Sequence, residues 1–379
     1  MRKLLVFHPT IAPYRIDFFN DLYAAFNTQV CLKFWNLRDQ TFDYQRIYSR
    51  FTFRPIYLKE MFALGGRSFS RGYWTCLDRY APDVVLTDEF GWSTMCVLIH
   101  RWIKRKKYKV VALCDDSYDM VSQRNDHSWI HRMARKWIAP KVDDIIVVEP
   151  RVEEWYKIHY QKGFFFPIIQ KDMVVRDLYM EALGGSSMLR SKHRLNGKRV
   201  FLFVGRLVAL KNVKTILRAF AHLNPQENRL VIVGDGPEMV SLKSLARNLN
   251  IDVLFTGRLE GNALYAWYLL ADVFVLASYK EAFGAVTNEA LLAGCYALVS
   301  QNAGSSCLIQ EGVNGYTFSP MDVEELAHRM KDVLQLPKVC EVNGLRESQM
   351  KLSYQECIQK RIQKFHRNTL PDEEFLEDE

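Results

Sequence analysis

Residues 271–294 read ADVFVLASYKEAFGAVTNEALLAG. The unbroken apolar run 273–277 is typical of a strand buried on both faces of a parallel sheet. The segment 287–293 is rich in helix-forming residues and follows after a short polar turn. The stretch therefore predicts a strand, a loop and a helix, the repeating unit of α/β folds.

Two carboxylates lie eight positions apart in this stretch. Glu281 falls in the loop and Glu289 falls inside the helix. Gly284 to Val286 would form the helix start, where free N–H groups and the positive end of the helix dipole favour an anion. Glu289 could accept two hydrogen bonds from a ribose diol, although a helix-start charge and a surface loop residue would explain the two glutamates equally well.

The same strand–helix alternation extends outward in both directions. In the second half, strands are expected at 199–204, 230–233, 253–256, 273–277 and 297–300, and helices at 211–223, 237–248, 264–270, 287–293 and 307–311. In the first half, strands are expected at 4–7, 30–34, 83–86, 110–113 and 144–148, with a helix at 15–26. The sequence therefore predicts an α/β protein of two Rossmann-like, doubly wound domains facing across a cleft, where ligands bind beyond the carboxyl ends of the strands.

The domain limits follow from composition. We expect a first domain at 1–176 and a second at 198–352, separated by a linker at 177–197 because Gly184-Gly185-Ser186-Ser187 is typical of flexible connections. A helix at 353–370 is expected to pack back on the first domain. The last segment, 371–379, is an acidic tail.

Composition excludes several classes of protein. The chain of 379 residues is 49% apolar and 25% charged, which is ordinary globular usage. No apolar run approaches the ~20 residues of a membrane span, and the start MRKLLVFHP is typical of a buried first strand and not of a signal peptide. Eight cysteines without a C-x-x-C pair favour free thiols in a reducing cytoplasm.

The formal charge of +8 is confined to residues 1–180, and it peaks at 101–109. This run is either a solvated helix end or a docking element for an anionic membrane, and its cations are Arg101, Lys104, Arg105, Lys106, Lys107 and Lys109. No nucleic-acid-binding motif accompanies it, so no nucleic acid partner is expected. Trp92, Trp129 and Trp137 are expected in the core or in a cleft wall.

Two glycine turns follow strands in the second half. Gly205 and Arg206 end one strand, and Lys211 follows five residues after the arginine. Glycine permits close backbone approach and the two cations suit a diphosphate, although surface cations after a turn are common. The second turn, Gly234-Asp235-Gly236, lacks the complete G-x-G-x-x-G fingerprint, so NAD binding has little support.

These segments occur in an order that resembles a known family. VGRLVALK, VGDGPE, FTG, the opening stretch and EGVNGYTFSPMD at 311–322 together resemble the carboxyl domain of retaining glycosyltransferases of family 4, which have the GT-B fold. The resemblance covers about 199–330 well and the amino half weakly. It implies catalytic roles for Arg206, Lys211, Glu281 and Asp115.

The resemblance also implies the donor contacts. Arg206 and Lys211 would hold the donor diphosphate, Glu289 the ribose, and Glu281 the donor sugar hydroxyls. The remaining donor-binding positions would be Gly205, Gly257, Arg258, Gly284, Ala285 and Val286. Because the cations neutralise the diphosphate, no metal ion and no cofactor are expected.

The amino half departs from the family pattern. Its first loop contains His8, Tyr14 and Arg15 where Gly-Gly is frequent, and Asp115 lies where a histidine is common. Cys307 replaces a frequent glutamate. We expect His8, Tyr14, Arg15 and Asp116 on the acceptor side, while these departures leave the donor sugar open.

Together these observations predict a retaining glycosyltransferase, either cytoplasmic or peripheral on the inner face of the membrane, that acts in surface polysaccharide biosynthesis. It would transfer a hexosyl or N-acetylhexosaminyl group from a UDP-sugar to a glycan or a lipid-diphosphate-linked acceptor. A UDP-sugar epimerase of the same fold and a non-catalytic sugar-nucleotide-binding protein are the alternatives.

Overall fold

The structure is a computed structural model that describes residues 1–36, 42–64, 67–122 and 129–367. The chain forms two compact units. Unit 1 comprises Met1–Asp116, Met120–Pro167 and Gln355–Glu379, and unit 2 comprises Ser117–Asp119 and Ile168–Tyr354. The acidic tail expected at 371–379 lies outside the described residues.

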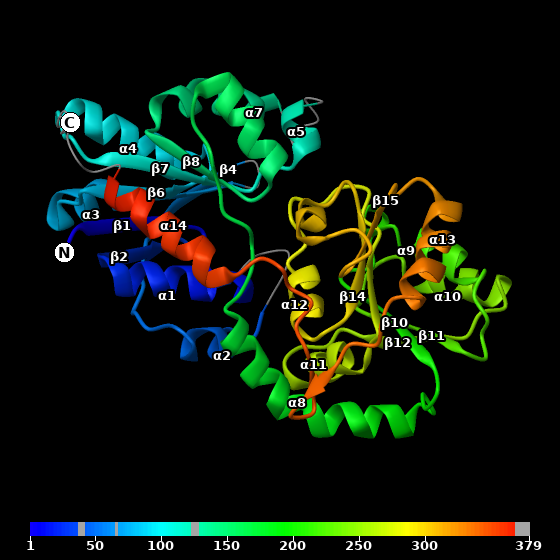
Figure 1. The fold of residues 1–379 in the computed structure, drawn as a ribbon. Helices are drawn as coiled ribbons and strands as arrows, with labels where there is room; N and C mark the ends of the chain where they lie inside the picture. The colour runs from blue at the N-terminus through cyan, green and yellow to red at the C-terminus, as the bar shows by residue number, and fades with distance from the viewer. Residues whose placement is uncertain (37–41, 65–66, 123–128, 368–379) are drawn as a thin grey trace, which may run out of the picture. The chain divides into compact units, whose positions relative to one another are not determined.

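Unit 1 contains a seven-stranded sheet in the order β3-β2-β1-β6-β7-β8-β9, with every neighbouring pair parallel (Figure 1). In chain order the strands are β1 (Lys3–His8), β2 (Asn27–Leu32), β3 (Ile56–Tyr57), β6 (Val84–Asp88), β7 (Lys109–Cys114), β8 (Asp144–Val147) and β9 (Phe164–Phe165). The expected strands are present with ends shifted by up to three residues. The two-residue strands β3 and β9 were not predicted, because two residues show no periodicity.

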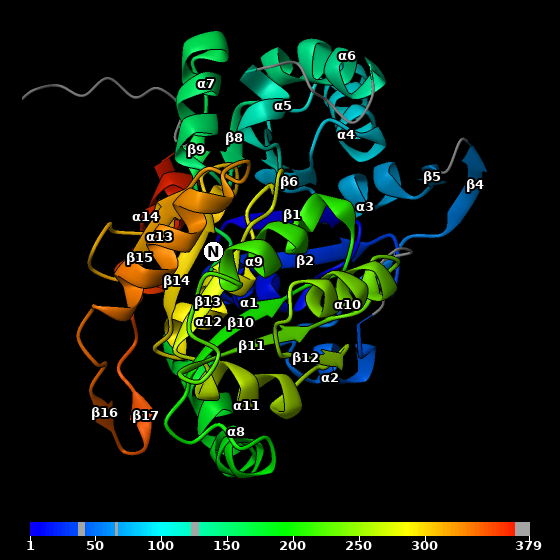
Figure 2. The same cartoon turned by 90° about the vertical axis from the view of Figure 1, so that its right-hand side faces the viewer.

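Helices cover both faces of this sheet. They are α1 (Ile16–Ala25), α2 (Tyr44–Ser49), α3 (Tyr73–Tyr80), α4 (Trp92–Ile103), α6 (Trp129–Ile138), α7 (Pro150–Tyr160) and α14 (Tyr354–Arg367), with 3₁₀ turns η1 (Pro13–Arg15) and η2 (Ala139–Lys141). Helix α5 (Tyr118–Ser122) follows β7, and the hairpin β4 (Glu60–Leu64) and β5 (Arg67–Ser70) extends from the sheet (Figure 2). Side chains of α3, α4, α6 and α7 share one buried cluster with β1, β6, β7 and β8, so these four helices cover the same face.

The C-terminal helix α14 belongs to unit 1 (Figure 1). Its Arg361 is fully buried, and the guanidinium Nη1 lies 3.4 Å from the Asp144 carboxylate. Burial lowers the pKa of Arg361 to about 10, while Asp144 opposes that shift. Phe365 of α14 meets Phe26 edge to face with ring centroids 5.8 Å apart, so the last helix completes the core of the first unit.

Unit 2 contains a six-stranded parallel sheet in the order β12-β11-β10-β13-β14-β15. In chain order the strands are β10 (Arg199–Val204), β11 (Asn228–Val233), β12 (Val253–Gly257), β13 (Val273–Leu276), β14 (Tyr296–Ser300) and β15 (Gly315–Phe318). The helices are α8 (Asp172–Lys192), α9 (Val213–Phe220), α10 (Met239–Asn248), α11 (Asn262–Leu270), α12 (Val286–Leu292) and α13 (Val323–Leu334). A small hairpin, β16 (Glu341–Val342) and β17 (Leu345–Arg346), extends from this unit (Figure 2).

Unit 2 also contains two 3₁₀ segments, η3 (Ala209–Lys211) and η4 (Gly304–Leu308). The helix expected at 307–311 is in fact η4, which ends at Leu308. Gly304 explains this tight turn, because a Cβ at that position would lie 2.2 Å from the Ala282 carbonyl oxygen.

The largest difference from the sequence analysis concerns 177–197. Most of this expected linker lies in α8, a helix of 21 residues that packs along α11. Gly185 serves this packing, since a Cβ added there would lie 3.3 Å from the Ala266 Cβ of α11. Tyr179 of α8 is fully buried and meets Tyr265 of α11 edge to face. A glycine pair that suggested flexibility therefore marks a close helix–helix contact.

Among the described residues, no helix is long and apolar enough to cross a membrane.

The contrast between the two glycines of α8 gives a stability test. Gly185→Leu should lower the free energy of unfolding by about 1–3 kcal/mol, because the side chain must displace α11. Gly184→Leu is the matched control, since a Cβ there has nothing within 4 Å; it should be neutral or stabilising by roughly 0.5–1 kcal/mol through helix propensity. Urea unfolding measures both variants, and equal destabilisation by the two would contradict this packing.

Candidate functional site

In unit 2, the loops that follow β10, β11 and β12 meet backbone to backbone at the carboxyl edge of the sheet. Gly205 N donates to the Val233 carbonyl at 3.0 Å, and Gly234 N donates to the Gly257 carbonyl at 2.9 Å. A Cβ at Gly234 would lie 1.8 Å from the Gly205 carbonyl oxygen, so no other residue fits there. The glycines predicted as donor contacts at 205 and 257 thus belong to one rigid edge.

Lys211 lies at the end of η3, and Asn212 fixes its position. Asn212 is buried with a left-handed φ of 52°, and its side-chain amide donates to the carbonyls of Ala277 at 3.1 Å and Pro320 at 2.8 Å. The Lys211 ammonium forms an ion pair with the Glu281 carboxylate. Sequence reasoning missed Asn212, although an Asn before a helix is itself a turn signal.

The loop between β13 and α12 holds Glu281 opposite Lys211. Ser278 Oγ donates to Glu281 Oε2 at 3.3 Å. Gly284 has φ of 95°, and a Cβ there would lie 2.7 Å from Leu276 Cδ2, so the turn into α12 requires glycine. Ala285 caps α12 and Val286 begins it, as the sequence predicted for the helix start.

Glu289 is held in place from two other helices and a loop. Its Oε2 accepts a hydrogen bond from Tyr268 Oη of α11 at 2.9 Å, and its Oε1 accepts one from Gln170 Nε2 at 3.2 Å. The Glu289 carbonyl accepts from Tyr179 Oη of α8 at 2.7 Å. Burial and the adjacent carboxylate raise the pKa of the Tyr268 phenol well above its usual range, so this donor keeps its proton.

Arg206 and Arg258 complete the predicted donor set. Both are exposed, in the loops after β10 and β12. Arg258 donates through Nε to Glu260 at 3.1 Å, whereas the Arg206 guanidinium forms no ion pair with any other described residue. The structure therefore gathers the unit 2 candidates on loops at one sheet edge, with a paired cation at Lys211 and an exposed one at Arg206.

In unit 1, the carboxyl ends of β1 and β7 bring three predicted residues together. Arg15 is buried and forms an ion pair with Asp115. Half-buried His8 ends β1, and its Nδ1 lies 2.6 Å from the Thr10 carbonyl oxygen. Burial, and next the positive charge of Arg15, lower the pKa of His8 to about 4, so the imidazole is neutral at neutral pH.

The same edge contains a pair that the sequence analysis did not single out. Lys33 Nζ lies 2.8 Å from Asp88 Oδ2, and Ser93 Oγ donates to the other oxygen of Asp88. Lys33 follows β2 and Asp88 ends β6, and a charged residue near the carboxyl end of each apolar run was the available signal.

Asp116 lies apart from these groups. It is 1% exposed, and its Oδ2 accepts hydrogen bonds from Tyr156 Oη at 2.6 Å and Arg135 Nη1 at 3.0 Å. These contacts join the segment after β7 to α6 and α7, and the acceptor contact of Asp116 stays a prediction. Tyr14, in η1, is half-buried.

Comparison with known proteins shows which family the segment with the unit 2 candidates resembles. The sequence model of the family described as "Glycosyl transferases group 1" matches residues 187–350. The matched segment is similar to that family, and it contains every residue that the sequence analysis predicted as a donor contact.

Relatives and solved structures extend the likeness beyond that segment. The uncharacterized glycosyltransferase MJ1069 of Methanocaldococcus jannaschii is 25% identical over 70% of this chain and 68% of its own length. Alpha-monoglucosyldiacylglycerol synthase of Streptococcus pneumoniae is 29% identical over 50% of this chain and 44% of its own. The crystal structure of Anabaena Alr3699/HepE in complex with UDP and glucose aligns with a TM-score of 0.71 at 16% identity, over 97% of this chain and 100% of the other.

The likeness to HepE covers both units and shows the GT-B fold. The protein is a glycosyltransferase, and its two units are Rossmann-like as the sequence predicted.

The lowered pKa of His8 makes a pH prediction for this glycosyltransferase. Between pH 6.5 and about 4 the unfolded chain binds a proton at position 8 that the folded chain does not, so this contribution to stability is present above pH 6.5 and is lost as the pH falls. His8→Asn should flatten the decline in the free energy of unfolding over this window by up to about 3 kcal/mol.

Urea unfolding at pH 7 and pH 4.5 measures the effect. His328→Asn, which removes an exposed imidazole of α13, is the control. If His8→Asn and the wild type decline in parallel, the imidazole at position 8 is not held neutral.

Proposed function

We propose that the protein is a retaining glycosyltransferase that moves a sugar from a UDP-sugar to a hydroxyl of a glycan or lipid-diphosphate-linked acceptor. The observation that carries the proposal is the ion pair between Lys211 and Glu281, beside the α12 start and in the unit that also fixes Glu289. These are the groups a nucleoside diphosphate sugar requires: a cation for phosphate, and carboxylates for its hydroxyls.

In this proposal the donor diphosphate is bound by Lys211 and Arg206. A diphosphate at Lys211 competes with Glu281 for the same ammonium group, and the released carboxylate then accepts hydrogen bonds from the donor sugar. The two cations stabilise the negative charge that develops on the leaving diphosphate. The backbone of Gly205, Gly284, Ala285 and Val286 contacts phosphate and sugar.

Glu289 binds the ribose diol through its carboxylate. Tyr268 and Gln170 each donate to one of its oxygens and so set the plane of the carboxylate before the nucleoside arrives. Gly257 and Arg258, at the end of β12, hold the base.

We infer a UDP donor because HepE, a structural neighbour of the whole chain, was crystallised with UDP and glucose. Retention of the anomeric configuration follows from the resemblance to family 4. The acceptor hydroxyl then attacks on the face from which the diphosphate leaves, and a diphosphate oxygen takes up its proton.

The acceptor is assigned to unit 1. Its carboxyl edge offers a neutral His8, the Arg15–Asp115 ion pair and the Lys33–Asp88 pair. Asp115 can accept a hydrogen bond from a sugar hydroxyl where other family members use a histidine. A relative named alpha-monoglucosyldiacylglycerol synthase supports a lipid-linked acceptor. Such a substrate fits a cytoplasmic enzyme that acts in surface polysaccharide synthesis and contacts the inner face of a membrane through its cationic run 101–109.

Two alternatives make different predictions. A UDP-sugar epimerase would convert the donor without an acceptor, and a non-catalytic binding protein would bind UDP without releasing sugar. Incubation with donor alone, followed by product analysis, separates the epimerase from the transferase.

Removing the donor contacts should abolish most turnover. Lys211→Ala and Glu289→Ala should each lower kcat/KM for the UDP-sugar by about 10²–10³-fold, because each loses a charged contact to the transition state or the ribose. Lys214→Ala is the matched control, since Lys214 is an exposed residue of α9 paired with Glu238. UDP release in the presence of acceptor is the measurement, and near-wild-type kinetics in both variants would overturn the site assignment.

Metal independence is a further expectation, because Arg206 and Lys211 supply positive charge at the diphosphate. Transfer should proceed at an unchanged rate after treatment with EDTA and after addition of Mg²⁺ or Mn²⁺. A loss of activity on chelation that Mg²⁺ restores would overturn this part of the proposal.

A further inference from the structure

Helices α4 and α6 of unit 1 present large apolar side chains to solvent. Trp102 is 80% exposed, Trp129 69% and Trp137 63%, and they are the three most exposed tryptophans of the described chain. The sequence expectation that Trp129 and Trp137 are core or cleft-wall residues is wrong. We call the following residues the α4–α6 face: Met95, Ile99, Trp102, Ile103, Trp129, Ile130, Met133 and Trp137.

The α4–α6 face is ordered by helix geometry. Met95, Ile99 and Ile103 repeat every four residues on α4, and Trp129, Met133 and Trp137 do so on α6. Each set therefore forms a stripe along one side of its helix. The opposite sides bury Val97 and His100 in α4, and Arg135 and Ile138 in α6. Each helix thus has a second apolar side beyond the one that packs on the sheet.

The two stripes point the same way. Helix α4 connects β6 to β7 and α6 lies between β7 and β8, so both are crossovers between neighbouring parallel strands in the same direction. Right-handed crossovers place both helices on one face of the sheet. Val97 and Ile138 accordingly share one buried cluster, and the sides away from that cluster face solvent together.

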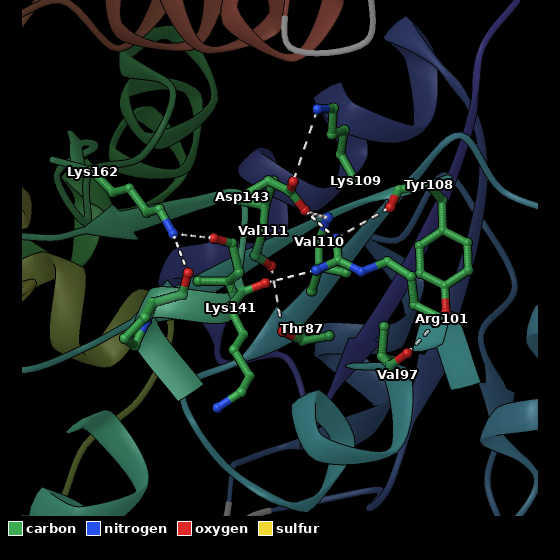
Figure 3. A network of polar contacts seen from close by, with 12 residues as sticks. Thr87, Val97, Arg101, Tyr108, Lys109, Val110, Val111, Lys141, Asp143 and Lys162 are labelled. Atoms are coloured by element: carbon green, nitrogen blue, oxygen red, sulfur yellow. Dashed lines mark hydrogen bonds and ion pairs between the residues drawn. The ribbon is translucent and has the colours of Figure 1, made fainter. Parts of the chain in front are cut away.

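A polar network fixes the ends of the two helices to each other (Figure 3). Arg101 of α4 forms an ion pair with Asp143, and its Nη2 donates to the Lys141 carbonyl at 2.7 Å. Lys141 in turn donates through Nζ to the Trp137 carbonyl at 2.7 Å and lies 5.6 Å from the centre of the Trp137 ring. The end of α4 that carries Trp102 is therefore held beside the end of α6 that carries Trp137.

The network also shows which cations of the run 101–109 have an acidic partner. Arg101 is paired with Asp143, and Lys109 Nζ lies 3.9 Å from the same carboxylate, so two of the six cations at 101–109 share one negative charge (Figure 3). The four between them, Lys104 to Lys107, are exposed. Arg132 and Lys136 add exposed cations on α6, and neither 91–109 nor 129–141 contains a single Asp or Glu.

We propose that the α4–α6 face docks on the surface of a bilayer that contains anionic lipids. Its tryptophans would lie at the headgroup boundary, where amphipathic rings are most stable. Its aliphatic residues would enter the outer acyl region, and its exposed cations would contact anionic headgroups. A protein partner fits less well, because lysine is depleted at protein–protein interfaces and this face is surrounded by lysine.

This inference deepens the acceptor side of the proposed function and rests on it in one respect. Docking would bring a lipid-linked acceptor to the enzyme, but the docking itself needs neither donor nor acceptor. Vesicle binding and UDP binding are therefore separate measurements of the two proposals.

The test is flotation of the full chain with vesicles of phosphatidylcholine alone or with 30% phosphatidylglycerol. We expect binding to the anionic vesicles, weakened when NaCl rises from 0.1 to 0.5 M. Trp129→Ser/Trp137→Ser and Lys104→Gln/Lys106→Gln/Lys107→Gln should each lower the partition coefficient at least tenfold.

Matched controls come from unit 2. Met188→Ser/Val240→Ser removes two apolar residues that are 73% and 76% exposed, and Arg218→Gln/Lys243→Gln/Arg247→Gln removes three exposed cations. Both should float like the wild type. Urea unfolding midpoints should be equal in all variants, which shows that they are folded.

Three outcomes would overturn the docking proposal. The first is a wild-type chain that does not float with anionic vesicles at 0.1 M NaCl. The second is equal flotation of the face variants and the wild type. The third is a soluble dimer that the Trp129→Ser/Trp137→Ser variant converts to monomer without any vesicle binding, which would make the face an interface between two copies. Flotation without UDP binding would support the docking surface and contradict the donor site.

Discussion

The arrangement of the loops in unit 2 depends on one close approach between two backbones. The Gly205 carbonyl oxygen occupies the space where any side chain at position 234 would begin. A second approach follows two residues later, because a Cβ at Gly236 would lie 2.5 Å from the Leu207 carbonyl oxygen. Leu207 N also donates to the Asp235 carbonyl at 2.8 Å. The loop that carries Arg206 and Lys211 is therefore packed against the loop after β11. This packing fixes the backbone that carries the two cations.

Many strands and turns of unit 2 could be predicted, because the sequence signals that mark them lie within the elements themselves. Strands buried on both faces show as apolar runs, and glycine turns mark their carboxyl ends. The sequence thus predicted that Lys211 and Glu281 follow strand ends, and β10 and β13 are adjacent in the sheet. Their ion pair could not be predicted, because it depends on Asn212, whose two carbonyl partners lie 65 and 108 residues away along the chain.

The errors have a common physical origin, since they concern residues whose partners are distant in sequence. The sequence analysis placed Gly185 in a linker. In the structure Gly185 lies at the contact of α8 with Ala266 of α11, where the absence of a side chain lets the two helices approach closely. Asp116 has its partners Arg135 and Tyr156 19 and 40 residues away, and no local pattern predicted these hydrogen bonds. Trp129 and Trp137 were expected in the core. Periodicity shows that a helix has an apolar side, but it does not show whether that side faces the protein interior or the solvent.

Helix α14 gives the chain an order of assembly. Most of unit 1 precedes unit 2 in the chain, but its core also needs Arg361 and Phe365, which follow all of unit 2. At 5–20 residues per second, translation of the intervening 168–354 takes roughly 10–40 s. During that interval Asp144 has no buried arginine opposite it, and Phe26 has no aromatic ring from α14 against it. The core of unit 1 is therefore incomplete while 168–354 are synthesised. Unit 2 has all its residues once Tyr354 is made, so it can fold first.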